Sequence, residues 1–599
     1  MRIIGARLKH GYLSCVRHHD YVTLMQSLKL WAPRLFLIGA LGIVPCGLQL
    51  SALAQVPPPQ PFPPERPGLP EELPSPPPPL VLPPPPPPIT KPEKLPQLRV
   101  VVREIKVVGS TVFSAEELAK VTAPYLNREV TSEDLEALRM ALTLHYINNG
   151  YVTSGAIIPD QTLKDGVLTI QIIEGKLSRI DVEGNRWFVP KYIQDRIALG
   201  AGPPLNINKL QERLQLLQTD TRFERLNAEL KPGVIRGESV LNVRVAEANP
   251  LRMWLEFNNY QSPTVGAERG LVTLAHQNLT GHGDIASFRY GQSAGVNPQF
   301  ETRYILPLTP YDTTVALEYR RNDFRVIESP FDILHLKSQS EILGVALRQP
   351  LYRTLRQEFA VGLIGERLFN KITFDPFGVI GRGPFPLPGA PDGVSVVSAL
   401  RFSQEWINRT SNQVISAFSR MSFGIDAFDA TINRDPMVPS GEFFSWLGQV
   451  QYARRVDPWR IQLLARVDAQ LSADRLFPLE QIAVGGRYSV RGYRENTLVR
   501  DNALLASVEV RVPVIRSTIG QDIVWLTPFV DYGRGWETKI TTPEPKNLTS
   551  TGIGLIWDIM QGSRFEVYWG HRWNQIDTPN DNLQDHGVHF QLVMEVLSL

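Results

Sequence analysis

Residues 479–493 decide the fold of this 599-residue chain, and they read Leu-Glu-Gln-Ile-Ala-Val-Gly-Gly-Arg-Tyr-Ser-Val-Arg-Gly-Tyr. A shorter stretch further along, residues 529–533, reads Phe-Val-Asp-Tyr-Gly. Glycines let a loop fold tightly, and an arginine at the tip of such a loop can form a charge-assisted hydrogen bond with an aspartate on a strand. We therefore predict that Arg491 pairs with Asp531 and that this contact holds the loop in place.

Both flanks of this loop alternate between apolar and polar residues. In 461–471 every odd-numbered residue is apolar, and most residues between them are polar; the same pattern recurs in 504–512 and 588–596. Strands of about 9 to 11 residues with this alternation are typical of transmembrane barrels, although a soluble β-sandwich also alternates. An open sheet leaves edge groups unsatisfied in lipid, so a membrane sheet must close. At roughly 22 residues per strand and connection, residues 251–599 suffice for about 16 strands.

The first residues of the chain have the pattern of a secretory signal peptide, which we place at 1–54. A basic region is followed by an apolar run over 35–44, and Ala52-Leu53-Ala54 is typical of a cleavage site. The basic region is long, and Met25 is an alternative start. A transmembrane anchor is the rival interpretation, but Pro45 and Gln49 interrupt a stretch that would need about 20 apolar residues.

Cysteine content and net charge exclude several classes of protein. Cys15 and Cys46, the two cysteines of the chain, both lie in the predicted signal peptide. The mature protein would then have neither a disulfide framework nor thiol chemistry. A formal net charge of +2 gives no indication of a nucleic-acid partner.

Residues 55–97 hold 21 of the 50 prolines. A segment of this composition favours the extended polyproline II conformation and cannot form a core, so we interpret it as a proline-rich linker. Binding to cell-wall material or to an SH3-like module is the alternative.

A duplicated unit follows the linker. The strand-like segment 105–110 returns as 180–185, and each copy has the predicted order strand, helix, helix, strand, strand. Ser114 and Glu117 form a predicted capping box at the start of the first helix, and Asn149-Gly150 ends the second. We place the two α+β units at 98–175 and 176–248.

These patterns carry a family resemblance. The units, with phrases such as 150–153 and 158–161, resemble polypeptide-transport-associated (POTRA) domains. The loop and the later strand resemble motifs of the TpsB transporters of two-partner secretion, the haemolysin secretion and activation type, as do 278–284 and Pro350-Leu351. The motif residues are Val490, Arg491, Gly492 and Tyr493 in the loop and Phe529, Asp531 and Gly533 on the strand.

The resemblance implies a membrane β-barrel of about 16 antiparallel strands over 250–599, preceded by two POTRA domains. Such a protein lies in the outer membrane with its POTRA domains in the periplasm. It forms a pore that recognises and secretes a TpsA-type exoprotein similar to a haemolysin or an adhesin. Its further partners would be outer-membrane lipid and, during biogenesis, the barrel-assembly machinery.

The chain departs from the pattern of this family in two respects, and two other functions remain as alternatives to secretion. Members of the family often have a plug helix before the linker, whereas proline begins here just after the predicted cleavage site; an aromatic last residue is common, but this chain ends in Leu599. An outer-membrane insertase of the same superfamily and a passive porin are the alternatives. Insertases usually carry more POTRA domains, and a porin needs none.

We expect no catalysis, no cofactor and no metal. Residues 281–286 match G-x-G-x-x-A, but this fingerprint must open a helix, and an alternating strand follows here. The histidines show no metal-ligand spacing.

An exported chain that arrives unfolded can add a strand to an exposed sheet edge. Our candidate edge is the segment Tyr151, Val152, Thr153, Ser154, Gly155, Ala156, Ile157 and Ile158. Pro159 ends this segment, and Gly155 leaves room for a second backbone. The alternative is a strand that pairs only within its own sheet.

The linker's composition yields a prediction about its role. Because it cannot bury enough apolar surface to offset the entropy of ordering, it should stabilise neither neighbour. We also predict that no plug helix precedes it. Deletion of residues 56–96 behind an intact cleavage site should leave the barrel assembled and secretion largely preserved, measured by heat-modifiability and exoprotein release. A barrel that fails to assemble would show that the segment packs, and greatly increased ion conductance would show that it occludes the pore.

Overall fold

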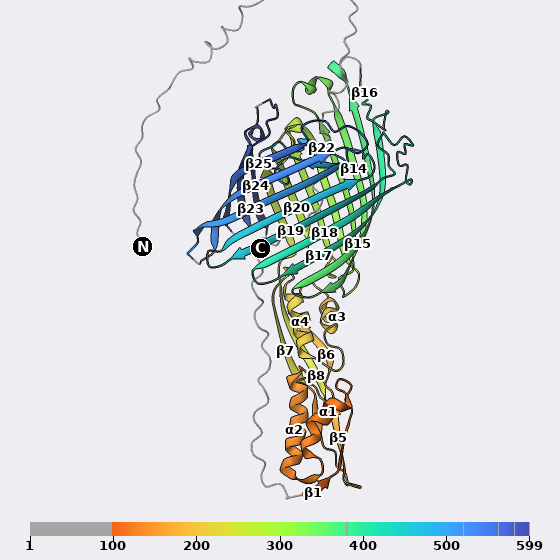
Figure 1. The fold of residues 1–599 in the computed structure, drawn as a ribbon, viewed down its shortest axis with the longest axis vertical. Helices are drawn as coiled ribbons and strands as arrows, with labels where there is room; N and C mark the ends of the chain where they lie inside the picture. Colours follow the sequence, from red (N-terminus) through yellow and green to blue (C-terminus); the bar gives the residue numbers. More distant parts are fainter. Residues whose placement is uncertain (1–98, 379–380, 519, 561, 580, 598–599) are drawn as a thin grey trace, which may run out of the picture. The chain divides into compact units, whose positions relative to one another are not determined.

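The computed structural model describes residues 99–378, 381–518, 520–560, 562–579 and 581–597. The predicted signal peptide and its cleavage site, the proline-rich linker with the question of a plug helix, and Leu599 lie outside the described residues. The described chain forms two small α+β units and a closed β-barrel (Figure 1).

The first unit packs two helices against a three-stranded sheet in the order β2-β5-β4. Its elements are β1 (Arg99–Val102), β2 (Glu104–Val108), α1 (Ala115–Thr122), η2 (Ala123–Tyr125), β3 (Arg128–Thr131), α2 (Ser132–Asn148), β4 (Gly155–Ile157) and β5 (Val167–Ile173). The predicted capping box of Ser114 and Glu117 is present at α1. On α2, Leu138, Leu142 and Tyr146 are fully buried. The structure also contains a two-stranded sheet formed by β1 and β3, which the predicted element order did not include.

The second unit repeats this plan without the additional pair. Its elements are β6 (Lys176–Glu183), α3 (Pro190–Ala198), α4 (Ile207–Gln218), β7 (Phe223–Pro232) and β8 (Glu238–Glu247), with the sheet order β6-β8-β7. Apolar side chains from both helices and all three strands form one core that includes Ile193, Leu210 and Val243. Each unit therefore has a hydrophobic core of its own.

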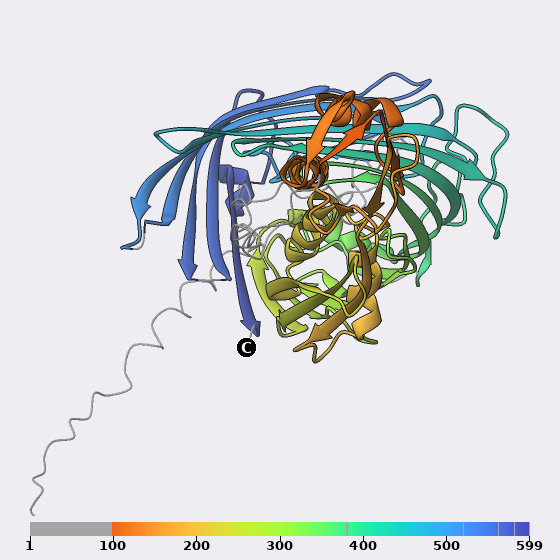
Figure 2. The same cartoon turned by 90° about the horizontal axis from the view of Figure 1, so that it is seen from below.

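The barrel is an antiparallel sheet of sixteen strands in the described residues, which confirms the predicted fold (Figure 1; Figure 2). The strands are β9 (Leu251–Asn258), β10 (Arg269–His276), β11 (Ile285–Ser293), β12 (Val296–Pro307), β13 (Thr314–Arg325), β14 (Lys337–Arg353), β15 (Gln357–Phe374), β17 (Val394–Arg409), β18 (Gln413–Ile425), β19 (Phe444–Val456), β20 (Ile461–Ser472), β23 (Asn502–Arg516), β24 (Asp522–Trp536), β25 (Asn547–Met560), β26 (Ser563–Arg572) and β27 (Val588–Leu597). The two-residue β16 (Gly383–Pro384) only pairs with the last two residues of β15 and is not counted among them. The last strand pairs with the first, so the ring is closed.

Alternating side chains separate the two faces of the barrel wall. On β20, Val467 is 45% exposed on the outside, whereas its neighbour Asp468 is 1% exposed in the interior. On β23, Val508 is 47% exposed and Glu509 is 7% exposed. The outside is therefore apolar and the interior polar, as the sequence alternation predicts. Within the described part of the chain, no helix combines the length and the apolarity that crossing a bilayer requires.

The second unit contacts two turns at one end of the barrel. The Val189 N–H donates to the Gly281 carbonyl at 3.0 Å, in the turn between β10 and β11. Arg222 donates to the Gly283 carbonyl of the same turn. Arg196 pairs with Asp312, in the turn between β12 and β13, at 2.9 Å. These contacts fix which end of the barrel carries the two small units.

A hydrogen-bonded carboxylate in the first unit makes its stability depend on pH. At the start of α2, the Thr131 backbone N–H, the Arg128 guanidinium and the Thr131 hydroxyl lower the pKa of Asp134 from 3.8 to about 2. A depressed pKa in the folded state stabilises the fold above the unfolded pKa, and this stabilisation is lost as the pH falls through the folded value.

We predict that the melting temperature of a fragment comprising residues 98–248 falls between about pH 4 and pH 2 and that Asp134→Asn makes this fall smaller. Glu133→Gln, on the same helical turn, is the control and should keep the wild-type slope. Parallel melting profiles for the wild type and Asp134→Asn, measured by circular dichroism, would contradict the assignment.

Candidate functional site

The loop between β20 and β23, residues 473–501, lies inside the barrel. It contains a short hairpin formed by β21 (Ile482–Val484) and β22 (Leu498–Arg500). At its tip, Val490 and Tyr493 are 0% and 1% exposed and pack with Leu505 and Leu548 of the barrel wall. The sequence motif 485–493 is therefore the tip of an inward-folded loop. We call residues 473–501 the lumen loop.

The guanidinium of Arg491 is the polar centre of the lumen loop. Its Nε and Nη2 donate to the two carboxylate oxygens of Asp531, both at 2.8 Å, in a bidentate pair. The backbone N–H of Arg491 donates to the same carboxylate at 3.0 Å. Nη1 donates to Glu509, and Nη2 donates to the Ser507 hydroxyl at 3.1 Å. The predicted Arg491–Asp531 contact is thus present, and a second carboxylate that the sequence analysis missed completes it.

The three motif residues of β24 each contact the lumen loop in a different way. Asp531 accepts the bidentate hydrogen bonds described above. The ring of Phe529 lies 3.7 Å from the guanidinium carbon of Arg491, which is the geometry of a cation–π contact. At Gly533 an added Cβ would lie 2.5 Å from Val484 and 2.7 Å from Val490, so a larger residue would displace the loop. The strand motif therefore gives the loop a carboxylate to bind, an aromatic ring to contact and a position without a side chain that leaves room for it.

Gly492 and Tyr493 place the loop tip against β25 and β26, the strands that follow β24 in the sheet. Gly492 has a φ of +93°, and a Cβ there would lie 2.7 Å from the Gly570 carbonyl oxygen of β26. The Tyr493 hydroxyl lies 3.0 Å from the carbonyl oxygens of both Thr549 and Asn574. Glycine is required at this position because the loop backbone touches the strand backbone directly.

Further ion pairs anchor the lumen loop, and none of them was predicted from the sequence. Glu480 accepts from Arg401 of β17 at 2.7 and 3.0 Å. Arg487 donates to Glu566 of β26 at 3.1 Å and lies over the Tyr568 ring. Arg494 joins Asp585 and Glu328, which lie in two loops at the end of the barrel away from the second unit. The glycines and arginine of the motif mark the loop in the sequence. Its partners on the barrel wall have no such pattern around them, because many other polar residues also face the interior.

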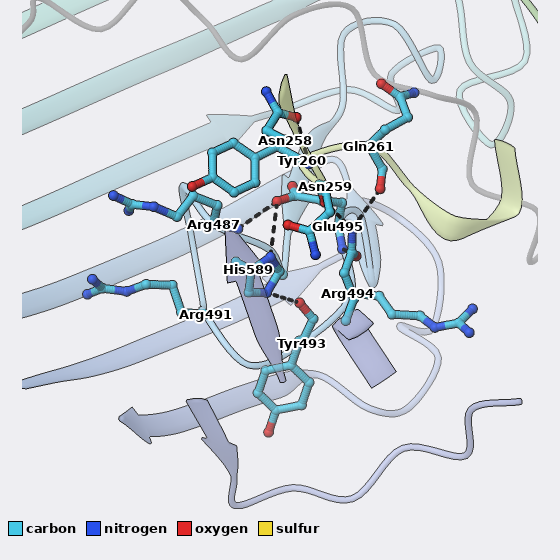
Figure 3. Close-up of polar contacts among 12 residues, drawn as sticks. Asn258, Asn259, Tyr260, Gln261, Arg487, Arg491, Tyr493, Arg494, Glu495 and His589 are labelled. Carbon is cyan, nitrogen blue, oxygen red and sulfur yellow. Dashed lines mark hydrogen bonds and ion pairs between the residues drawn. The ribbon is translucent and has the colours of Figure 1, made fainter. Parts of the chain in front are cut away.

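The lumen loop also contacts the seam where β27 meets β9 (Figure 3). His589 of β27 is fully buried, and its Nε2 lies 3.1 Å from the Tyr493 carbonyl oxygen. Just beyond β9, the Asn259 side chain donates to the Val588 carbonyl at 2.9 Å and accepts from the Phe590 N–H at 2.8 Å. Side chains therefore extend the hydrogen bonding between β9 and β27, next to the loop tip.

Beside the lumen loop, the interior holds a cavity of about 260 Å³ lined by both polar and apolar residues. Charged residues of both signs line it, among them Arg320, Glu366, Arg401, Arg420, Asp468 and Glu480. No group of histidine, cysteine, aspartate or glutamate residues suited to a metal ion occurs among the described residues. The arrangement can hold water and other polar or charged groups.

The candidate edge in the first unit is shorter than predicted. Only Gly155–Ile157 form a strand, β4, and this strand is at the edge of its sheet. Residues 151–154 form a turn, because the Tyr151 N–H bonds to the Tyr146 carbonyl and the Ser154 N–H bonds to the Tyr151 carbonyl. The outward N–H of Ala156 donates to the Thr143 hydroxyl of α2 at 3.1 Å. An added strand would have to replace this bond.

Two family models match the chain. One, described as a POTRA domain of ShlB type, matches residues 100–175. The other, described as haemolysin secretion/activation protein ShlB/FhaC/HecB, matches residues 237–373 and 395–556.

Characterised relatives are similar over most of their length. The outer membrane transporter CdiB of Escherichia coli O6:K15:H31 (strain 536 / UPEC) is 24% identical over 496 residues, covering 78% of this chain and 81% of the relative. The haemolysin transporter protein ShlB of Serratia marcescens is 22% identical over 450 residues, covering 72% and 76%.

Solved structures share the fold. CdiB from Escherichia coli superposes with a TM-score of 0.62 at 21% identity, covering 85% of this chain and 92% of that structure. BamA from Haemophilus ducreyi lacking POTRA domains 1–3 gives a TM-score of 0.50 at 12% identity, covering 83% of this chain and 100% of that structure.

Proposed function

Because the chain belongs to the ShlB/FhaC/HecB family of haemolysin secretion/activation proteins, the outer-membrane transporters of two-partner secretion, we propose that it exports a TpsA-type exoprotein similar to a haemolysin or an adhesin. The POTRA units lie in the periplasm, and the barrel crosses the outer membrane. Outer-membrane lipid and the barrel-assembly machinery are its further proposed partners.

One observation carries the proposal. Arg491 is held between Asp531 and Glu509, 3% exposed, in the interior of a closed barrel. A loop held inside the barrel by such a contact can keep the pore closed to solutes until it is displaced, and a secretion pore must stay closed to solutes and yet admit a chain.

The lumen loop and the passing polypeptide compete for the same space. The loop lines one side of the charged cavity, and interior residues of β10 and of β12 to β20 line much of the rest. An extended chain needs a continuous path, so we propose that the loop tip withdraws from Asp531 and Glu509 during export. Charged side chains of the exoprotein can replace the loop's ion pairs as it leaves, which lowers the free-energy cost of releasing it.

Capture of the exoprotein precedes this step. We propose that its unfolded segment adds to β4 of the first unit, where only Ala156 offers an outward backbone N–H within the strand, and that N–H is bonded to Thr143. Thr143 would release this bond to the incoming strand. Since the periplasm lacks ATP, we propose that folding of the exported chain outside the cell supplies the energy.

The insertase alternative has less support. The likeness to BamA is one of fold at 12% identity, whereas the matching family model describes secretion proteins. A gene for a large secreted protein with a β-helix-type amino terminus next to this one would favour export. An indispensable locus without such a neighbour would favour an insertase.

We predict that Arg491→Ala strongly reduces secretion while leaving a heat-modifiable barrel in the membrane. Removing one partner of a buried ion pair costs about 3 to 5 kcal/mol, because it leaves the other charge buried and unpaired. Here Asp531 would be left without a cation, while Glu509 would keep Arg511 at 2.8 Å, so the seated loop should become the minor state. The measurement is exoprotein released into the medium per assembled barrel.

Arg434→Ala, which changes an exposed arginine of another barrel loop, is the matched control and should secrete normally. Normal secretion by Arg491→Ala itself would refute the role that we assign to the Arg491 pair.

A second prediction concerns capture at β4. Proline at Ala156 removes the outward N–H of β4, and proline at Ser154 removes an N–H of the turn that precedes β4, so one of the two should block binding of the exoprotein's amino-terminal domain to the 98–248 fragment without unfolding it. Val234→Pro, in the exposed turn between β7 and β8, is the control. Unchanged binding by both variants, with native circular dichroism spectra, would exclude this edge.

A further inference from the structure

Basic residues lie on the outer face of β13, β14 and β15, near the ends of these strands that are away from the turns contacting the second unit. On β14 the residues with even numbers from Ser338 to Ile342 are buried in the interior, so Lys337 points outward with Leu343. The same alternation places Arg325 of β13 and Lys371 of β15 on the outside. All three side chains are exposed.

Strand register brings these cations together. Arg325 lies directly opposite Lys337, and Lys337 lies opposite Thr373 of β15. Arg382, from the loop after β15, donates to the Thr373 hydroxyl at 3.2 Å. Lys371 is one step diagonal from Lys337, since it faces Gln339. We call Arg325, Lys337, Lys371 and Arg382 the outer basic cluster.

Carboxylates do not balance the outer basic cluster. The two acidic residues on this face, Asp323 and Glu341, both pair with Arg321, at 2.8 and 3.6 Å. No salt bridge joins a member of the cluster to a carboxylate among the described residues. Like charges directly opposite each other on neighbouring strands are destabilising, and Arg325 faces Lys337 in this way. The arrangement calls for an external anion.

Position on the wall decides which anion can reach the cluster. The apolar outer residues of β14 are Leu347, Val345 and Leu343, which are 43%, 51% and 59% exposed. From Leu343 to Lys337 the strand rises six residues, about 15 Å along the membrane normal at roughly 3.3 Å per residue and a tilt near 40°. Because the POTRA units are periplasmic, this end of the barrel faces the outer leaflet.

We propose that the outer basic cluster binds the phosphate groups of lipopolysaccharide in the outer leaflet. The apolar band below the cluster would contact the acyl chains, and the cations would contact phosphates in the layer above them. An acidic protein would have to approach through that lipid layer, so a lipid is the favoured occupant. The proposal depends on the orientation of the barrel in the outer membrane and not on which protein it exports.

The experiment measures binding of lipopolysaccharide to the purified full-length protein in detergent by native mass spectrometry. The combined variant Arg325→Gln/Lys337→Gln/Lys371→Gln should bind about tenfold more weakly or worse, because charge-assisted contacts are lost. Enzymatically dephosphorylated lipopolysaccharide should bind the wild type equally weakly. Arg454→Gln removes an outward cation near the periplasmic end of β19 and should leave binding unchanged.

Three outcomes would overturn the proposal: unchanged binding by the combined variant, equal affinity of the wild type for dephosphorylated lipopolysaccharide, or equal affinity for phosphatidylglycerol. The last would indicate a nonspecific attraction to anionic lipid. If the combined variant does not form a heat-modifiable barrel, comparing the binding of native and dephosphorylated lipopolysaccharide to the wild type still tests the proposal. The charge-conserving variant Arg325→Lys/Lys337→Arg should retain most of the affinity.

Discussion

A peptide group in lipid has no solvent partner for its N–H and C=O, and this constraint determines the whole barrel. The sheet must close, so β27 returns to pair with β9, and the wall must alternate between an apolar outside and a polar inside. A closed sheet of sixteen strands encloses more space than its own side chains fill. The lumen loop enters this space, and its polar contacts follow from having a polar wall to meet.

The lumen loop is held by charge as well as by apolar packing. Arg491, Arg487 and Arg494 each meet carboxylates, and Glu480 meets Arg401. Buried ion pairs add little net stability, since desolvation offsets much of their attraction, but they fix a single register for the groups that form them. A hydrophobic loop would bind the wall more permanently and would offer nothing for a hydrated, passing chain to replace. Charge therefore suits a loop that must be both well placed and removable.

Much of the fold followed from local sequence. Alternation in 461–471 and 504–512 predicted the barrel wall, and Ser114 with Glu117 predicted the start of α1. Within the site, Arg491 and Asp531 could be paired because glycines and a strand motif mark them. Glu509, Arg401 and Glu566 could not, since each is one polar residue among many that face the interior, and only strand register brings it to the loop. The edge strand predicted over Tyr151–Ile158 is longer than the one observed, because the turn after α2 uses the backbone N–H groups of Tyr151 and Ser154.

The direct contact between Gly492 and Gly570 has a consequence for how the loop can move. Backbone meets backbone there with no side chain between them to adjust, and Gly533 leaves equally little clearance for Val484 and Val490. A shift of about one ångström would break the bidentate geometry at Asp531 and the packing at both glycines together. A partial displacement therefore loses nearly as many stabilising contacts as full withdrawal. The lumen loop should behave as an all-or-none switch, with few molecules populating positions between seated and withdrawn.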